Sequence, residues 1–320
     1  MSLFGKAPSR LALAAAALLS LPAAAGAQAV GSSPSFQATR FSIAPGTEDF
    51  LSVYSARTAP PLGFNALVSL DYAKEPLRLV NGGQTVVLIG DQWNLQFAAS
   101  IGILRWLEVG VVVPGTVSQS GDVASMVNSA LANFTPSGGL GDPRIIPRFH
   151  IYDIADFSFG AFLPFTIPVG STHDYTGYGS VTASPAVAAE WSGVKALRIA
   201  ANFGVSIRPT RTVGDLTVGS AFDYGLAGSY DFPVGPFSFT GLLTLAGEVG
   251  IAASSGATYP VEMLGAVRWN APLGIFATLA GGPGLSCGYG TPNYRAVFAA
   301  GFALPGYDAR QEKGQEKEKR

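Results

Sequence analysis

The stretch DQWNLQFAASIGILRWLEVGVVV, Asp91–Val113, contains two runs in which one kind of residue alternates with another. Odd-numbered positions in Trp93–Ile101 are apolar, and even-numbered positions in Asn94–Ser100 are polar or small. Alternation with a period of two is typical of a β-strand whose two faces meet different surroundings. Only the short segment Ile103–Trp106 separates the two runs. The stretch therefore predicts two antiparallel strands joined by a tight turn.

The same alternation recurs along most of the chain and predicts twelve strands, an even number as in single-chain bacterial outer-membrane barrels. The predicted strands are Gly63–Tyr72, Asp91–Gly102, Leu107–Val113, Leu140–Tyr152, Phe157–Ile167, Val181–Trp191, Ala196–Arg208, Gly219–Asp231, Phe237–Ile251, Thr258–Asn270, Gly274–Gly281 and Tyr294–Ala303.

The connections between these strands alternate in length. The short ones are Ile103–Trp106, Asp153–Asp156, Ser192–Lys195, Phe232–Gly235 and Ala271–Leu273. The longer ones are Ala73–Gly90, Pro114–Gly139, Val169–Gly179, Pro209–Val218, Ala252–Ala257 and Gly282–Asn293. With the amino end in the periplasm, every short turn falls on the periplasmic side and every longer loop outside, as in membrane barrels.

Charge is scarce in this chain. Charged residues make up 13% of its 320 residues, the mean hydropathy is +0.31, and the net charge is −1. An ordinary soluble domain has roughly 25% charged residues. Lys74 and Lys195 are the only lysines between Arg10 and Arg310, so the polar faces are too poor in charge to form a soluble exterior. The charge balance gives no indication of a nucleic-acid partner.

The first residues predict a cleaved signal peptide over residues 1–27. Lys6 and Arg10 precede the apolar run Leu11–Pro22, and Ala25–Ala27 provides a small-residue cleavage site. No apolar run of 18 or more residues follows, which excludes helical membrane spans on length. A closed barrel is then the remaining way to cross a bilayer, because it pairs every backbone amide internally. We expect a transmembrane antiparallel up-and-down β-barrel in the outer membrane of a Gram-negative bacterium.

The stretch GGLGDPRIIPRFHIY, Gly138–Tyr152, has an unusually cationic polar face. If apolar faces meet lipid, this face lines the lumen, where arginine can bind carboxylates from other strands in a bidentate way. Pro143 and Pro147 predict a bulge or an irregular start to the strand. The expected lumen-lining charge network is Asp71, Glu108, Asp142, Arg144, Arg148, His150, Glu190, Arg198, Arg208, Asp223, Glu248, Glu262, Arg268 and Arg295, with Asp231 as a further inward acid.

Aromatic residues fall near the predicted strand ends, where amphipathic rings suit the two headgroup levels of a membrane. The expected aromatic belt is Tyr72, Trp93, Trp106, Tyr152, Trp191, Tyr230, Tyr259, Trp269 and Phe302.

Several segments, in this order, resemble the amino-terminal transmembrane barrel of the OmpA family in its long-barrel form. They are FQATRFSIAPGTEDFL, LDYAKEPLRL, ILRWLEVGVVVPG, GLGDPRIIPRF, VEMLGAVRW and GLSCGYGTPNYRAVFAAGF. The resemblance implies a barrel that usually precedes a peptidoglycan-binding domain. Only PGYDARQEKGQEKEKR follows Leu304, so we expect no such domain. The expected organisation is a signal peptide (1–27), a lead-in segment (28–62), the barrel (63–304) and a charged, disordered periplasmic tail (305–320).

Catalytic motifs are weak, and we expect neither an enzyme nor a metal or cofactor site. GLSCG, Gly284–Gly288, matches G-x-S-x-G but falls in a Gly-rich loop before a strand rather than on a strand-to-helix elbow. His150 and His173 are the only histidines, and Cys287, the only cysteine, excludes an intramolecular disulfide. No Cys/His cluster has the spacing of a zinc site.

One helical pattern lies in the longest loop, where apolar residues of Val123–Phe134 follow helical spacing and Ser120 or Asp122 could cap it. The segment is either a short helix that packs on the loop or barrel rim, or a lid over the mouth of the barrel.

A count of twelve strands does not decide the function. Barrels of eight strands are filled by side chains, whereas barrels of sixteen or more strands leave a channel. The leading hypothesis is a passive pore for small polar solutes. The alternatives are a structural or interaction barrel closed by Arg–carboxylate pairs, and a transporter of hydrophobic compounds. Expected partners are outer-membrane lipid, small polar solutes and the barrel assembly machinery during biogenesis, with the oligomeric state left open.

Overall fold

The computed structural model describes residues 36–81, 84–121, 138–172, 174–213, 216–251, 259–286 and 288–306. Five sequence predictions lie wholly or mostly outside the described residues: the signal peptide, the Val123–Phe134 helix, His173, Cys287 and the charged tail. Within the described residues, no helix is long and apolar enough to cross a membrane.

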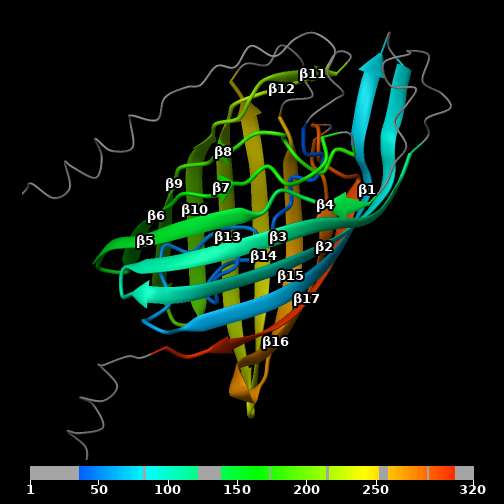
Figure 1. The fold of residues 1–320 in the computed structure, drawn as a ribbon. Helices are drawn as coiled ribbons and strands as arrows, with labels where there is room; N and C mark the ends of the chain where they lie inside the picture. The colour runs from blue at the N-terminus through cyan, green and yellow to red at the C-terminus, as the bar shows by residue number, and fades with distance from the viewer. Residues whose placement is uncertain are drawn as a thin grey trace, which may run out of the picture. The chain divides into compact units, whose positions relative to one another are not determined.

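Twelve antiparallel strands form a closed barrel (Figure 1). They are β1 (Phe64–Asn81), β2 (Gln84–Leu104), β3 (Leu107–Ser120), β5 (Arg144–Ile154), β6 (Phe157–Phe162), β9 (Ala186–Val194), β10 (Leu197–Ser206), β13 (Ala221–Val234), β14 (Phe237–Gly250), β15 (Val261–Asn270), β16 (Ile275–Pro283) and β17 (Tyr294–Leu304). The first strand pairs with the last, from Phe64 opposite Leu304 to Lys74 opposite Tyr294. The predicted fold class and the position of each predicted strand are confirmed.

Shorter pieces extend this barrel. Prolines divide two of the predicted strands, because proline has no N–H to donate to the ladder. Pro164 separates β6 from β7 (Phe165–Thr166), and Pro185 separates β8 (Thr182–Ala183) from β9. The other short pieces are β4 (Gly139–Leu140), which pairs with β3, the hairpin of β11 (Arg211–Val213) and β12 (Leu216–Val218), and a 3₁₀ turn at Pro272–Gly274.

The hairpin of β1 and β2 is longer than predicted. We expected a loop over Ala73–Gly90, but the two strands stay paired as far as Asn81 opposite Gln84. The register shifts on either side of Leu77, and such irregularities interrupt the alternation that would have shown the strands in the sequence. Among the described residues, the hairpin beyond Lys74 and Asp91 forms strand pairs only within itself, and it rises past the neighbouring strands (Figure 1).

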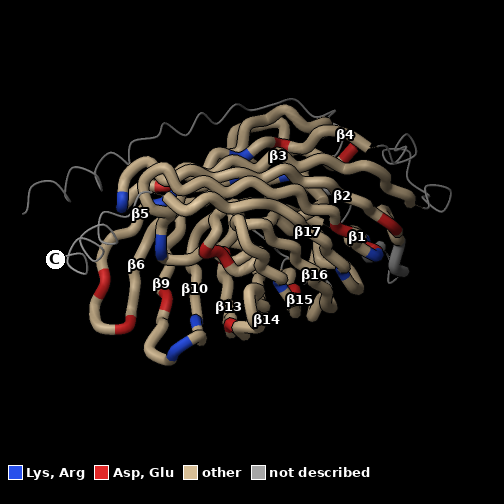
Figure 2. Tube along the Cα trace, turned by 90° about the horizontal axis from the view of Figure 1, so that it is seen from below, with Lys and Arg blue, Asp and Glu red and all other residues tan. Residues whose placement is uncertain are grey.

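The outward faces of the strands are apolar and exposed. Phe97, Leu279 and Phe298 are 52%, 68% and 52% exposed, whereas the adjacent Gln96 and Thr278 are buried. Long stretches of the strands carry no charged residue (Figure 2). The same exposure is found around the barrel, at Val68, Leu70, Ile101, Val111, Ile145, Ile151, Val187, Ile199, Phe203, Phe222, Leu226, Leu243 and Val267. An apolar surface this extensive is unusual in a soluble protein and suits contact with lipid.

The segment before the first strand lies inside the barrel. Phe36 packs on Tyr175 and Tyr289, which belong to connections at the long-loop end. At the opposite end, the backbone N–H of Leu62 donates to the carbonyl of Gly102, next to the short turn between β2 and β3. Residues 36–62 therefore run through the lumen from the long-loop end to the short-turn end before β1 begins (blue in Figure 1). β1 itself begins at the short-turn end, as the alternation of the connections predicts, whereas Phe36, the first described residue, lies at the long-loop end.

The lumen is less polar than predicted, because the lead-in segment brings its own apolar side chains. A hydrophobic core forms between these side chains and inward-facing residues of the strands. The lead-in contributes Phe41, Ile43, Phe50, Leu51, Val53 and Ala56, and the barrel wall contributes Ala98, Val112, Ile146, Ala188, Ala200, Ala227, Leu264, Phe276, Val297 and Ala299, among others. Burial of this apolar surface stabilises the segment inside the barrel.

Candidate functional site

Residues 45–57, which we call the lumen turn, lie inside the barrel towards its short-turn end. The backbone of the lumen turn reverses at the bridge between Phe50 and Val53. Asp49 fixes the turn by accepting hydrogen bonds from the backbone N–H groups of Gly46 (2.7 Å) and Ser55 (2.8 Å). Such side-chain acceptors are the usual means by which aspartate stabilises a turn.

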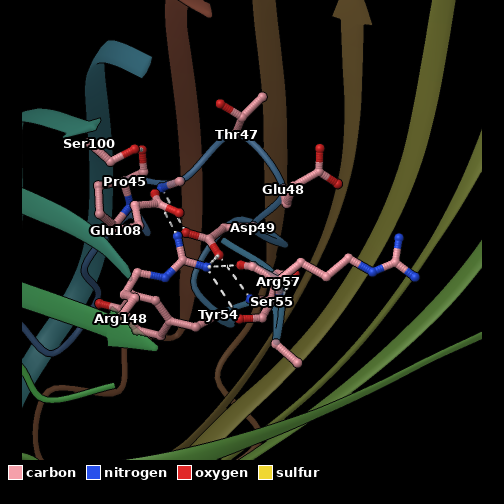
Figure 3. A network of polar contacts seen from close by, with 12 residues as sticks. Pro45, Thr47, Glu48, Asp49, Tyr54, Ser55, Arg57, Ser100, Glu108 and Arg148 are labelled. Carbon is pink, nitrogen blue, oxygen red and sulfur yellow. Dashed lines mark hydrogen bonds and ion pairs between the residues drawn. The ribbon is translucent and has the colours of Figure 1, made fainter. Parts of the chain in front are cut away.

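Arg148 on β5 binds the lumen turn to the barrel wall (Figure 3). Its Nη2 lies 2.7 Å from Asp49, and its Nη1 lies 2.9 Å from Glu108 on β3. All three side chains are buried. Nη2 also donates to the carbonyls of Ser55 (3.2 Å) and Arg57 (3.1 Å). A buried charge of this kind is tolerated only when it is paired and hydrogen-bonded, which explains the arginine in this strand.

A second contact lies on the wall formed by β9 and β10. Glu190 accepts hydrogen bonds from Ser55 Oγ (2.5 Å) and Arg198 Nε (2.8 Å) and lies 3.4 Å from Arg57. Arg198 also forms an ion pair of 3.1 Å with Glu48. Glu190 and Arg198, which were both predicted to line the lumen, therefore bind the lumen turn as well as each other.

Asn202 on β10 binds the backbone of Tyr54 on both sides, through its amide oxygen and its amide nitrogen, each at 2.8 Å. Across the barrel, Arg268 on β15 donates to the carbonyls of Thr47 (3.4 Å) and Asp49 (3.3 Å). These contacts fix the middle of the lumen turn from β10 and from one further strand, β15.

Pro45, where the lumen turn begins, is bound from β1 and β2. Its carbonyl accepts from Asn65 Nδ2 (2.7 Å) and Ser100 Oγ (3.0 Å). With the contacts from β3, β5, β9, β10 and β15, the turn is hydrogen-bonded on several sides of the wall. It therefore fills the lumen near the short-turn end.

Towards the long loops, Glu248 and Arg295 are each the centre of a group of ion pairs. Glu248 on β14 binds Arg208 at 2.6 Å and Arg40 of the lead-in segment at 3.1 Å. Arg295 on β17 binds Glu262 at 2.8 Å and also Asp71 on β1. Arginine therefore neutralises the carboxylates of Asp71, Glu248 and Glu262.

An apolar cluster lies at the long-loop end of the lumen. Burial raises the pKa of Tyr175 and of Tyr289 well above the usual tyrosine value, so both phenols stay neutral at physiological pH. The cluster consists of Phe36, Ala38, Leu77, Leu88, Ile89, Tyr175, Tyr178, Leu216, Val218 and Tyr289.

Asp142, which we expected to pair with arginine in the lumen, has another role. It accepts hydrogen bonds from the backbone N–H groups of Val169 (3.0 Å), Gly170 (2.7 Å) and Tyr178 (2.7 Å). The described residues form no ion pair with it. Asp142 therefore fixes the loop between β7 and β8, and the expected Arg–Asp142 pair is not formed.

Within the described residues, Asp223, Asp231, Arg144 and Arg268 also form none of the expected Arg–carboxylate ion pairs. Asp231 accepts from Thr240 (2.7 Å), and Asp223 accepts from Ser206. His150 lies near the short turns, with Nδ1 3.2 Å from the carbonyl of Ala56 and Nε2 3.3 Å from an oxygen of Asp153.

The predicted belt residues lie on the outside of the barrel near strand ends. Trp106 and Tyr152 are each 51% exposed close to short turns. At the other end, Tyr72 packs on Trp93 with ring centroids 4.9 Å apart. Tyr230, Tyr259, Trp269 and Phe302 are likewise exposed, and Trp191 is partly buried. Their role at a membrane interface remains a prediction.

The sequence reasoning missed the charged and polar residues of the lead-in segment. The missed residues that bind the wall are Arg40, Glu48, Asp49, Ser55 and Arg57. A signal for them existed, because four of these five residues are charged in an apolar chain that is otherwise poor in charge.

A cavity of about 230 Å³ lies in the lumen beside the lead-in segment. The lead-in lines it with residues 39–42 and 52–54, and the wall lines it from β5 round to β15. The polar lining includes Thr39, Ser42, Ser52, Tyr54, Arg144, Thr166, Thr182, Ser184, Asn202, Ser206, Arg208, Asp223, Thr244, Glu248 and Glu262. Drug-sized ligands occupy roughly 300–1,000 Å³, so this cavity suits a smaller polar molecule.

Two solved structures are similar to this chain over their whole length. The COG4313 outer membrane channel from Pseudomonas putida F1 has a TM-score of 0.56 and 13% identity, with 82% of this chain and 100% of that chain covered. The NanC porin has a TM-score of 0.50 and 9% identity, with 75% of this chain and 100% of that chain covered. No protein-family model and no curated protein sequence matches the chain. At these identities the likeness shows the fold alone, a closed antiparallel barrel of the architecture found in these two proteins.

Proposed function

We propose that this protein is an outer-membrane barrel that acts as a passive channel for small polar solutes. The observation that carries the proposal is the cavity of about 230 Å³ beside the lead-in segment, whose lining combines hydroxyl, amide and charged side chains with apolar ones such as Phe41, Val53, Phe162 and Leu264. Most of the lining residues carry a polar group, which offers hydrogen-bonding partners to a polar solute.

The arrangement of charged and apolar side chains is the reverse of that in a soluble protein, which supports a location in a membrane. Exposed apolar side chains surround the barrel, while Arg148, Arg295 and Asp71 are buried in its lumen. In this proposal the chain is exported by a cleaved signal peptide to the outer membrane of a Gram-negative bacterium and inserted there by the barrel assembly machinery. The assignment to the OmpA family also remains a proposal, supported by the short motifs in the sequence.

The lumen turn controls how wide the channel is at the short-turn end. Because several strands bind it through buried ion pairs and hydrogen bonds, we expect it to stay in place on the time scale of single ion passages. Conductance should therefore be small and steady, and it should rise when the contacts of the lumen turn are weakened.

The test is single-channel conductance of refolded residues 28–320 in a planar bilayer. We expect small, steady steps from the wild type and larger or flickering steps from Arg148→Gln, which removes the charge that holds Asp49 and Glu108. Arg105→Gln, in the short turn between β2 and β3, is the matched control. Folding is checked for each variant by heat-modifiable gel mobility. Absence of conductance from folded wild type and folded Arg148→Gln would contradict the proposal.

A second candidate is a structural or interaction barrel with a closed lumen. The observation in its favour is the hydrophobic core that the lead-in segment forms with the barrel wall. This candidate predicts that neither the wild type nor Arg148→Gln conducts, although both are folded. The same recordings therefore separate the two candidates.

A further inference from the structure

Arg144, at the start of β5, differs from the other arginines that line the cavity. A guanidinium carries five N–H donors. Among the described residues, Arg144 makes a single side-chain hydrogen bond, from Nη2 to Gln37 Oε1 at 3.3 Å. No carboxylate of the described residues forms an ion pair with it. Most of its donors are therefore available to another partner.

Arg208, in contrast, has its donors engaged. Its Nε binds the carbonyl of Gly219 (2.6 Å), its Nη1 binds Tyr178 (3.3 Å) and its Nη2 binds Glu248 (2.6 Å). Arg40, the third arginine of the cavity lining, forms an ion pair with the same Glu248. The other two arginines of the cavity lining therefore have carboxylate partners, which Arg144 lacks within the described residues.

The acids that line the cavity are bound elsewhere. Glu248 lies between two arginines, and Glu262 binds Arg295. Asp223 accepts a hydrogen bond from Ser206. None of these three carboxylates contacts Arg144, so its positive charge faces the cavity without a direct counter-charge.

Neutral donors lie around the same space. Thr166 lines the cavity together with Arg144, and so does Ser184, whose hydroxyl shares one hydrogen bond with Ser206 (3.0 Å). Ser42 lines it as well, and its buried Oγ has no hydrogen-bond partner within the described part of the chain. A guanidinium fork together with hydroxyl donors is the arrangement that proteins use to bind carboxylate or phosphate oxygens.

We propose that Arg144 is the centre of a binding site for an oxyanion, the carboxylate or phosphate group of a small solute. The site deepens the proposed function, since it would make the cavity favour small anions over cations. A solute group that binds there would satisfy the free donors of Arg144.

The test measures the cavity directly and does not require conductance. Ser42→Cys is placed in a Cys287→Ser background as the parent protein, and the refolded parent in detergent is labelled with an anionic or a cationic methanethiosulfonate. The ratio of the two labelling rates reports the electrostatic potential at the introduced thiol. We expect the anionic reagent to be favoured, and Arg144→Gln to lower the ratio by about tenfold, because one fixed charge acts oppositely on the two reagents. Arg144→Lys should retain most of the ratio, and Arg105→Gln should leave it unchanged.

Competition then identifies the anion. At matched ionic strength, sodium acetate or sodium phosphate should slow anionic labelling of the parent but not of the Arg144→Gln variant. The more effective salt distinguishes a carboxylate site from a phosphate site. An unchanged rate ratio in folded Arg144→Gln, or no labelling of the thiol that Ser42→Cys introduces in the parent, would overturn the inference. If the labelling experiments show the site but the protein never conducts, only the channel is refuted. If the protein conducts but Arg144→Gln leaves the labelling ratio unchanged, only the site is refuted.

Discussion

Asp49 and Arg148 are separated by 99 positions in the chain, yet their side chains lie 2.7 Å apart inside the barrel. Arg148 also binds Glu108, so one guanidinium connects the lumen turn to two neighbouring strands. Removing one partner of a buried pair leaves an uncompensated charge and costs about 3–5 kcal/mol. This contact is therefore one of those that hold the segment before the barrel in the lumen.

Asp49→Asn should loosen the lumen turn while the barrel stays folded. The backbone N–H groups of Gly46 and Ser55 both donate to Asp49, and the neutral amide would accept them more weakly. Hydrogen exchange at these two amides should accelerate by about tenfold or more, since a loss of about 1.4 kcal/mol corresponds to a factor of ten. Asp156→Asn, in an exposed short turn, should leave both exchange rates unchanged. Equal protection in the two variants would show that Asp49 does not fix the turn.

Gly46→Ala should displace the guanidinium of Arg148. An added Cβ at this position would lie 2.0 Å from Nη1, and Arg148 cannot move without breaking its buried ion pairs. Overpacking of this kind costs about 1–3 kcal/mol. Urea denaturation in lipid vesicles should show this loss for Gly46→Ala. Gly265→Ala, where the nearest atom lies 4.0 Å away, should show none, and a loss of similar size in both would refute the argument.

Asp142→Ala should release the loop between β7 and β8. Three backbone N–H groups would lose their acceptor, and each unmet buried donor costs about 1–3 kcal/mol. Limited proteolysis of the refolded protein should cut between Ile167 and Val181 several times faster than in the wild type. Asp231→Ala, whose carboxylate accepts from a neighbouring strand instead, should not change cleavage at this loop.

Leu279→Arg should hinder insertion into lipid. Leu279 is 68% exposed on the outward face of β16, and an arginine facing lipid near the bilayer midplane costs about 2–4 kcal/mol. Leu285 is 52% exposed and lies in the following loop, so Leu285→Arg is the matched control and should cost little. Unfolding free energies in phospholipid vesicles test the difference. Equal costs would contradict a lipid-facing position for Leu279.

The twelve strands could be predicted because alternation is a local property. Each residue of a strand points to the opposite side from its neighbour, so the pattern of Asp91–Gly102 shows both the strand and its outward face. Prediction failed where the ladder is irregular. The register shifts beside Leu77 concealed the outer part of the first hairpin, and Pro164 and Pro185 each divided one expected strand in two.

The charges of the lumen could be predicted as a set but only in part as pairs. Arg148 was expected to meet carboxylates from other strands, and Glu108 on β3 is one of them. Its other partner, Asp49, comes from the lead-in segment. That segment has no periodicity, so its sequence does not show that it passes through the lumen. Asp142 was grouped with the lumen acids because of its charge, but its neighbours in space are backbone amides of a loop.

The sequence by itself determined the class of fold, the number of strands and the face that each strand turns outward, because these depend on spacing between near neighbours. The tertiary structure alone decided what occupies the lumen. Closure of β1 on β17 encloses the space through which residues 36–62 pass. The partners of Asp49, Ser55 and Arg144 depend on that path, because they come from parts of the chain that only the closed barrel brings together.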